Sequence, residues 1–189
     1  MKKIFTLIFS IFYLFGSAQL DTDHWFAPMS ARSGTTNLQS LLYLSTNEAT
    51  PFTVQIFNNN VLYTTATISK GNPTSVSIPE YFMMATVQSD LFTPSNKGMY
   101  VKGPKKFYAN YRFEVTNHAE IITSKGLAGI GTTFYAAMAP NTTATSYVSS
   151  NIGILATEDN TSVTISGYDP GVVFSNGSSP TSINFILNK

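Results

Sequence analysis

Residues 152–165 restrict the fold of this chain most, because two strand patterns flank a turn there. Apolar residues stand at every second position on both sides of the turn, at Ile152, Ile154, Ala156, Val163 and Ile165. Period-two spacing places such side chains on one face of a β-strand. Residues 158–160, Glu-Asp-Asn, are side chains that hydrogen-bond to nearby backbone and tolerate positive φ. The segment therefore predicts a β-hairpin with one face toward the core.

Residues 37–79 show the same organisation at hairpin spacing. Strands are predicted at residues 38–44, 52–57, 61–68 and 74–78. Asn58, Asn59 and Asn60 form a predicted turn, because asparagine tolerates positive φ, and Gly71-Asn72-Pro73 interrupts the next strand. Four short strands at this spacing favour an all-β fold, an antiparallel β-sandwich.

Further strand patterns continue to the end of the chain. Apolar and polar residues alternate clearly at residues 107–115. Other strands are predicted at residues 99–102, 119–123, 132–138, 172–174 and 183–187. Gly103-Pro104 predicts a turn between two of them. Residues 81–86 are apolar without clear periodicity, so they form either a short helix or a loop.

Two segments of the chain resemble each other. Residues 44–50 align without a gap on residues 155–161, and a Val-x-Ile strand follows each segment. Threonine-rich composition alone also produces such likeness, so one sandwich and two related sandwich repeats both stay open. In the second case, the regions are residues 19–110 and 111–189. We expect the second region to be incomplete at its C-terminus and the chain to be a fragment of a longer protein.

Residues 1–18 have the pattern of a secretory signal peptide. Lys2 and Lys3 are followed by a mainly apolar run over residues 4–15, which is too short to span a bilayer. Small residues at positions 16–18 predict cleavage after Ala18, which leaves Gln19 first. The sequence therefore predicts a secreted or cell-surface protein, and we expect no transmembrane segment in the mature chain.

Composition excludes several classes of protein. Charged residues make up 11% of the chain, and without Lys2 and Lys3 nine basic residues remain against 10 acidic ones. This balance provides no attraction for nucleic acid. Cysteine is absent, which excludes a disulfide-rich scaffold and a thiol nucleophile.

Few residues are candidates for a site. Asp21, Asp23 and His24 are metal-ligand types, but no second cluster accompanies them, so we predict no metal and no other cofactor. Residues 24–26, His-Trp-Phe, form either an exposed aromatic contact site or a segment in which Trp25 and Phe26 cap the end of a sandwich core. The glycine-rich residues 124–131 lack the order of a phosphate loop and are better explained by tight turns.

Catalytic residues are not predicted. The two histidines lie far apart in the sequence, and neither accompanies a Gly-x-Ser-x-Gly motif. Glu158 and Asp159 are adjacent residues in a predicted turn, where carboxylates serve better as hydrogen-bond acceptors than as an acid/base pair. We therefore expect a protein that is not an enzyme.

Several segments together resemble the IgGFc-binding protein N-terminal domain family. They are Asp21-Thr22-Asp23-His24-Trp25-Phe26-Ala27-Pro28, residues 125–135 and residues 154–165. Ile130-Gly131-Thr132 stands where that family usually has Leu-Gly-Thr. The likeness is closest to the family's version in large gliding-motility and type IX secretion surface proteins of gliding bacteria. It implies more β-domain beyond Lys189 and provides no catalytic residues to transfer.

Two functions follow as expectations. The first is a non-enzymatic exported surface module, an adhesin-like or structural segment of a large cell-surface protein, with an unknown protein or glycan ligand. The alternative is a carbohydrate-binding or accessory module of an exported hydrolase. The full-length reading frame discriminates between them, because a catalytic domain after Lys189 favours the alternative.

Overall fold

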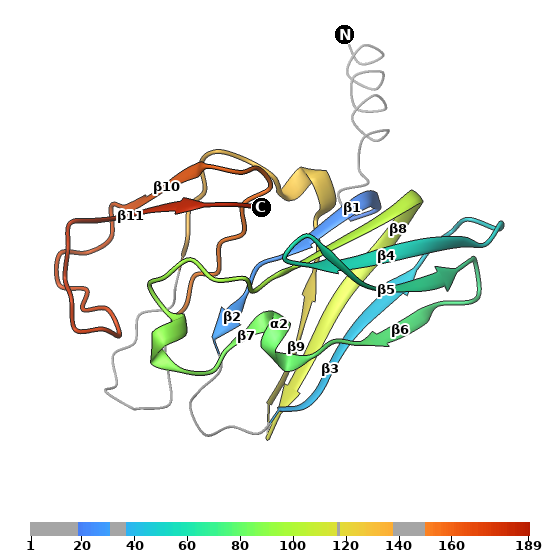
Figure 1. The fold of residues 1–189 in the computed structure, drawn as a ribbon, viewed down its shortest axis with the longest axis horizontal. Coiled ribbons are helices and arrows are strands. Elements are labelled where there is room, and N and C mark those ends of the chain that lie inside the picture. The colour runs from blue at the N-terminus through green and yellow to red at the C-terminus, as the bar shows by residue number, and fades with distance from the viewer. Residues whose placement is uncertain (1–18, 31–36, 117, 138–149) are drawn as a thin grey trace, which may run out of the picture.

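The structure is a computed structural model that describes residues 19–30, 37–116, 118–137 and 150–189. Its described part is all-β, as predicted, with antiparallel sheets that curl into a half-barrel (Figure 1). The signal peptide, including Ala18, and most of the threonine-rich residues 141–150 lie outside the described residues. Within the described ranges, none of the helices combines the length and apolar character needed to cross a membrane.

Seven strands form the main sheet around one long strand, β8 (Met99–Val115). The others are β1 (Asp21–Phe26), β3 (Asn37–Ser45), β4 (Phe52–Asn58), β5 (Val61–Ile68), β6 (Thr74–Ser77) and β9 (His118–Thr123). The first half of β8 pairs with β1 and β4, and its second half pairs with β3 and β9. The sheet therefore has two four-stranded halves, β5-β4-β8-β1 and β6-β3-β8-β9, which share β8 (Figure 1).

The predicted turn at Gly103-Pro104 is wrong, because β8 continues through both residues. This is the place where β8 leaves one half of the sheet and enters the other. Gly103 is buried here, and an added Cβ would lie 3.0 Å from the Phe107 ring and 3.2 Å from the Phe52 ring. Proline suits this position, since it has no N–H to donate to a neighbouring strand.

One hydrophobic core lies between the two halves of the sheet. The alternation predicted for residues 107–115 is confirmed, because Phe107, Ala109, Tyr111 and Val115 are buried and Phe113 packs partly buried against the core. Strand β4 alternates in the same way, with its inward side chains fully or almost fully buried. Period-two patterning of neighbouring strands thus makes one apolar interior.

The hairpin of β4 and β5 confirms the predicted asparagine turn. Asn59 and Asn60 have φ values of 48° and 59°, which non-glycine residues rarely adopt and asparagine tolerates best. Two central residues with positive φ form the turn type that matches the twist of hairpin strands. Strands β3, β4, β5 and β6 all lie at positions where the sequence predicts strands.

A short segment packs against the core. Helix α2 (Glu80–Met83) confirms the helical alternative for this region and is shorter than predicted. It is followed by β7 (Met84–Ala85), which pairs in parallel with β2 (Met29–Ser30). Phe82, Met83 and Met84 are buried members of the core, so this segment packs against the interior of the half-barrel.

The hairpin predicted at residues 152–165 is wrong in its first strand. Residues 151–156 form no strand, and β10 (Thr161–Ser166) pairs instead with β11 (Ser182–Leu187). The segment before the turn packs on the main sheet: Gly153 lies against the carbonyl oxygen of Pro28, and the Leu155 side chain lies over Gly98. Residues 151–156 therefore lie beside Pro28 and Gly98, and β10 pairs with β11, which lies further along the chain.

Two more predicted strands are absent from the described residues. Residues 132–137 are exposed and form no strand, and residue 138 lies outside the described part. Residues 172–174 belong to a loop in which the Phe174 N–H donates a backbone hydrogen bond of 2.9 Å to the Ser178 carbonyl oxygen. The boundary between the predicted regions 19–110 and 111–189 falls within β8, and the division into two repeats stays a prediction.

Candidate functional site

The outer face of the β5-β4-β8-β1 half carries two neighbouring rows of side chains, which the strand register aligns. The aromatic row consists of Trp25, Tyr100, Phe57 and Leu62, which are paired in turn across the four strands. The polar row beside it consists of Asp23, Lys102, Gln55 and Thr65, paired in the same order. On β1, β4 and β8 the members of the two rows are two residues apart, so they point to the same side of the strand. On β5, Leu62 and Thr65 lie on either side of a register shift and pair with the outward residues Phe57 and Gln55. Both rows therefore face away from the core.

The three rings of the aromatic row are stacked on one another. The Trp25 and Tyr100 centroids lie 5.2 Å apart with 22° between the ring planes, and the Tyr100 and Phe57 centroids lie 5.7 Å apart with 29° between them. These separations are typical of offset stacking, in which neighbouring rings overlap only in part. All three rings are half-buried, and Leu62 at the end of the row is 47% exposed. The row therefore offers apolar surface held in place by its own packing.

Asp23 joins the two rows. Its carboxylate accepts hydrogen bonds from the Tyr100 hydroxyl and, at 2.6 Å, from the Thr22 hydroxyl. Burial and the neighbouring Asp23 carboxylate raise the pKa of Tyr100 well above its usual range, so the phenol remains a donor. This bond fixes the orientation of the Tyr100 ring.

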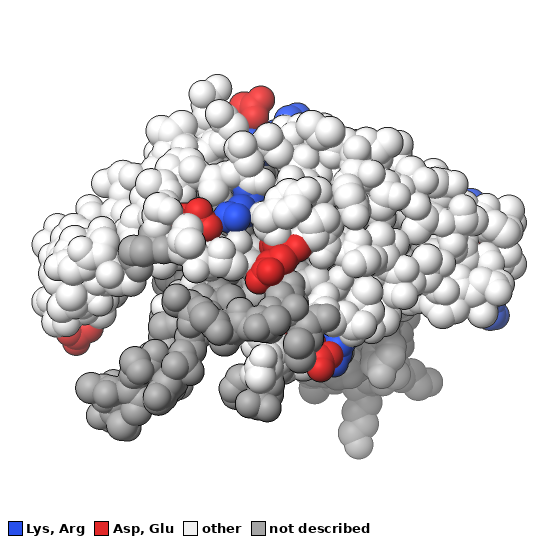
Figure 2. Space-filling model, turned by 60° about the horizontal axis from the view of Figure 1, so that its bottom comes forward, with Lys and Arg blue, Asp and Glu red and all other residues white. Residues whose placement is uncertain are grey.

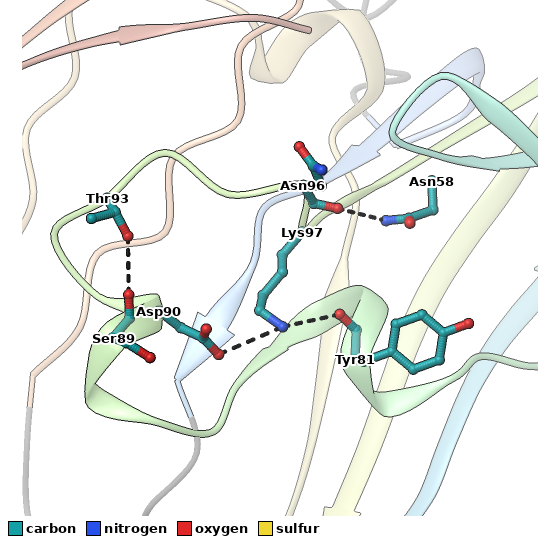
Figure 3. A network of polar contacts seen from close by, with 7 residues as sticks. All are labelled: Asn58, Tyr81, Ser89, Asp90, Thr93, Asn96 and Lys97. Atoms are coloured by element: carbon teal, nitrogen blue, oxygen red, sulfur yellow. Dashed lines mark hydrogen bonds and ion pairs between the residues drawn. The ribbon is translucent and has the colours of Figure 1, made fainter.

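A polar network fastens the start of β8 next to the end of β4 (Figure 3). The Asn58 amide donates to the backbone oxygens of Asn96, at 3.1 Å, and Gly98, at 2.9 Å. Lys97 donates to the backbone oxygen of Tyr81 at 3.2 Å and pairs with Asp90 at 3.6 Å. Asn58 follows Phe57 directly on β4, and Gly98 lies two residues before Tyr100, so the network ties together the two segments that carry these rings.

His24 lies directly behind the two rows, on the core side of β1. The ring is fully buried, and its Nε2 lies 2.9 Å from the backbone oxygen of Phe107 and 3.2 Å from that of Asp21. Two carbonyl acceptors require Nε2 to carry the proton, which leaves Nδ1 as a buried lone pair with no hydrogen-bond partner. Burial lowers the pKa of His24. This histidine therefore holds β1 to β8 as a neutral donor.

The residues considered as metal ligands do not converge. Asp23 faces outward, His24 faces the core, and Asp21 accepts a hydrogen bond of 2.8 Å from the Leu127 N–H. Among the residues that the structure describes, no group of three ligand-type side chains surrounds a possible ion position. Asp21 instead fastens the short 3-10 helix η3 (Gly126–Gly129) to β1.

The glycine-rich segment and the acidic turn have structural roles. Gly126 has a φ of 58°, and an added Cβ would lie 2.5 Å from the Asp21 side chain, which confirms the prediction of a tight turn with close approach. Asn160 has a φ of 57°, as predicted for this turn. Asp159 is confirmed as an acceptor, although it accepts from the Lys189 N–H at 3.2 Å rather than from its own turn.

The sequence identified only part of this face. Phe26 is buried in the core, as the capping alternative predicts, whereas Trp25 is half-buried and faces outward; its role as a contact residue stays a prediction. Tyr100 and Phe57 were missed as its partners. The alternation around each of them signals an outward side chain, but only the cross-strand register shows that the three rings meet.

Comparisons with known proteins add no relative, since no family model, curated protein or solved structure matches this chain.

Proposed function

We propose that this chain is a non-enzymatic module of an exported surface protein that acts by binding, as an adhesin-like segment. The observation that carries the proposal is the aromatic row beside the polar row on the outer face of the sheet. Aromatic residues held rigidly at a surface provide contact area at little cost in conformational entropy, and they are enriched at binding interfaces. The resemblance to the IgGFc-binding protein N-terminal domain family is part of this proposal.

Three further observations support binding over catalysis and export over retention. His24, one of two histidines in the chain, is buried and engaged with backbone carbonyls, so it serves β1 and not a substrate. Charged side chains are sparse on the face in Figure 2, in line with their 11% share of the sequence. A surface of this kind favours short-range contacts over long-range electrostatic attraction. Lys2, Lys3 and the apolar run after them support export.

Three measurements on source cells test the proposal. Mass spectrometry of the surface fraction should find Gln19 as the first residue, and a membrane-impermeant amine reagent should label the exposed Lys102 on intact cells. An excess of the purified protein should then block attachment of those cells to their surface. An intact Met1, or a Lys102 that reacts only after lysis, would contradict export. Attachment that the purified protein leaves unchanged would contradict adhesion.

A further inference from the structure

The chemistry of the two rows defines the class of ligand. A sugar ring has a face of C–H groups and a rim of hydroxyls, so it needs apolar contact on one side and hydrogen-bonding groups around it. The aromatic row provides the first through dispersion contacts with ring carbons. The polar row provides the second, because Asp23 accepts, Lys102 donates, and Gln55 and Thr65 do both. Lys102, Gln55 and Thr65 are exposed, so these groups are open to a ligand.

The charge and the length of the two rows restrict the class of ligand further. Asp23 and Lys102 are directly paired across β1 and β8, so the polar row contains one negative and one positive group side by side. Their fields cancel over a short distance, which gives no preference for a charged ligand. Four strands separated by about 4.8 Å each make a row of roughly 14 Å. This length exceeds one sugar ring and fits a chain of several rings.

We propose that the aromatic row and the polar row together bind an uncharged polysaccharide. The inference rests on the proposed binding function and names its ligand. The sugar chain lies across the strands, with its C–H groups against the parts of the Trp25, Tyr100 and Phe57 rings that offset stacking leaves uncovered and its hydroxyls toward the polar row. The stacking of the rings and the Asp23–Tyr100 hydrogen bond fix these side chains before a ligand arrives, so binding costs little side-chain entropy.

Trp25 gives a direct measurement of binding, because it is the single tryptophan of the chain. Purified protein is titrated with three neutral probes, cellohexaose, mannohexaose and maltohexaose, and with anionic polygalacturonate. We expect a saturable change in Trp25 fluorescence with at least one neutral probe. Tyr100→Ala should weaken this binding about tenfold, the loss typical of removing one aromatic anchor. Tyr43→Ala is the matched control, since Tyr43 is an exposed ring on β3, in the other half of the sheet, and it should bind as the parent does.

A second variant keeps the test decisive if Tyr100→Ala fails to fold. Lys102→Ala combined with Gln55→Ala removes two exposed side chains and should weaken binding several-fold with an unchanged circular dichroism spectrum. Three results overturn the inference: no neutral probe binds the folded parent, only polygalacturonate binds, or the Lys102/Gln55 variant binds like the parent. If no saccharide binds but the protein still blocks cell attachment, the ligand class is wrong and the binding function stands. If both fail, both proposals are wrong.

Discussion

Lowering the pH from 7.5 to 5.5 should destabilise the protein through His24. The folded state holds this ring neutral, because protonation would place an N–H at Nδ1, where none of the described residues offers an acceptor within hydrogen-bond distance. Burial lowers its pKa below the ordinary value of 6.5, although Asp21 and Asp23 oppose that shift. Between the folded-state pKa and 6.5, the unfolded chain therefore binds a proton that the folded protein does not. Stability is complete above pH 6.5 and is lost as the pH falls below it.

The magnitude follows from the same linkage. Each pH unit below 6.5 removes at most about 1.4 kcal/mol from the free energy of unfolding. At pH 5.5 this is a noticeable share of the ~5–15 kcal/mol by which a domain is stable. For a chain of this size, the melting temperature should fall by about 2–6 °C. Most carboxylates remain ionised at pH 5.5, so the change in stability between pH 7.5 and 5.5 comes mainly from the histidines.

The assay compares the parent with His24→Gln, which keeps a donor near the Phe107 carbonyl but cannot titrate. Urea unfolding is followed by Trp25 fluorescence at several pH values between 5.5 and 7.5. We expect the variant to be less stable at pH 7.5 and to show a shallower loss toward pH 5.5. His118 is present in both proteins, so its contribution cancels in the comparison. Equal slopes for the two proteins, or a parent that gains stability in acid, would refute the argument.

Substitutions at four positions test the packing and one turn. Ile56→Ala should cost about 2–5 kcal/mol of stability, because Ile56 is fully buried. Ile165→Ala should cost clearly less, because Ile165 is half-buried on the two-stranded sheet. Chemical unfolding compares the two variants, and equal losses of stability would contradict this difference in burial. Gly153→Ala should lower the melting temperature, since the new Cβ would overlap the Pro28 carbonyl oxygen; an unchanged value would mean that residues 151–156 are not docked there. Asn60→Gly should leave stability nearly unchanged and Asn60→Val should reduce it by about 1 kcal/mol or more, because φ is 59°; similar values for both would argue against this turn.

Local patterns predicted the elements whose cause is local. The hairpin of β4 and β5 needs only alternating side chains and two asparagines with positive φ, and both are visible in the sequence. Residues 107–115 were likewise predicted, because burial on one face leaves a period-two pattern. The sequence does not distinguish the short helix α2 from a loop, since one helical turn is too short to show a period.

The errors concern partners that lie far away in the sequence. Residues 152–156 have a strand pattern, but their alternation equally suits an extended segment that packs on Pro28 and Gly98. No local sequence pattern indicates that β10 pairs with β11 and not with residues 152–156. The candidate site has the same limit: Trp25 was noticed, but its contact with Tyr100 depends on the register between β1 and β8. Which strands become neighbours is decided by the complete core.

The shared strand β8 also determines the order in which the chain can fold. Strand β1 has β8 as its pairing partner, and the His24 ring meets its acceptor on β8 at a separation of 83 residues. Contacts between such distant residues require a large loss of chain entropy before they contribute, which slows folding. Until β8 has been synthesised, β4 with β5 and β3 with β6 are separate strand pairs without a common interior. The main sheet therefore cannot be completed before all residues of β8, up to Val115, are available for pairing.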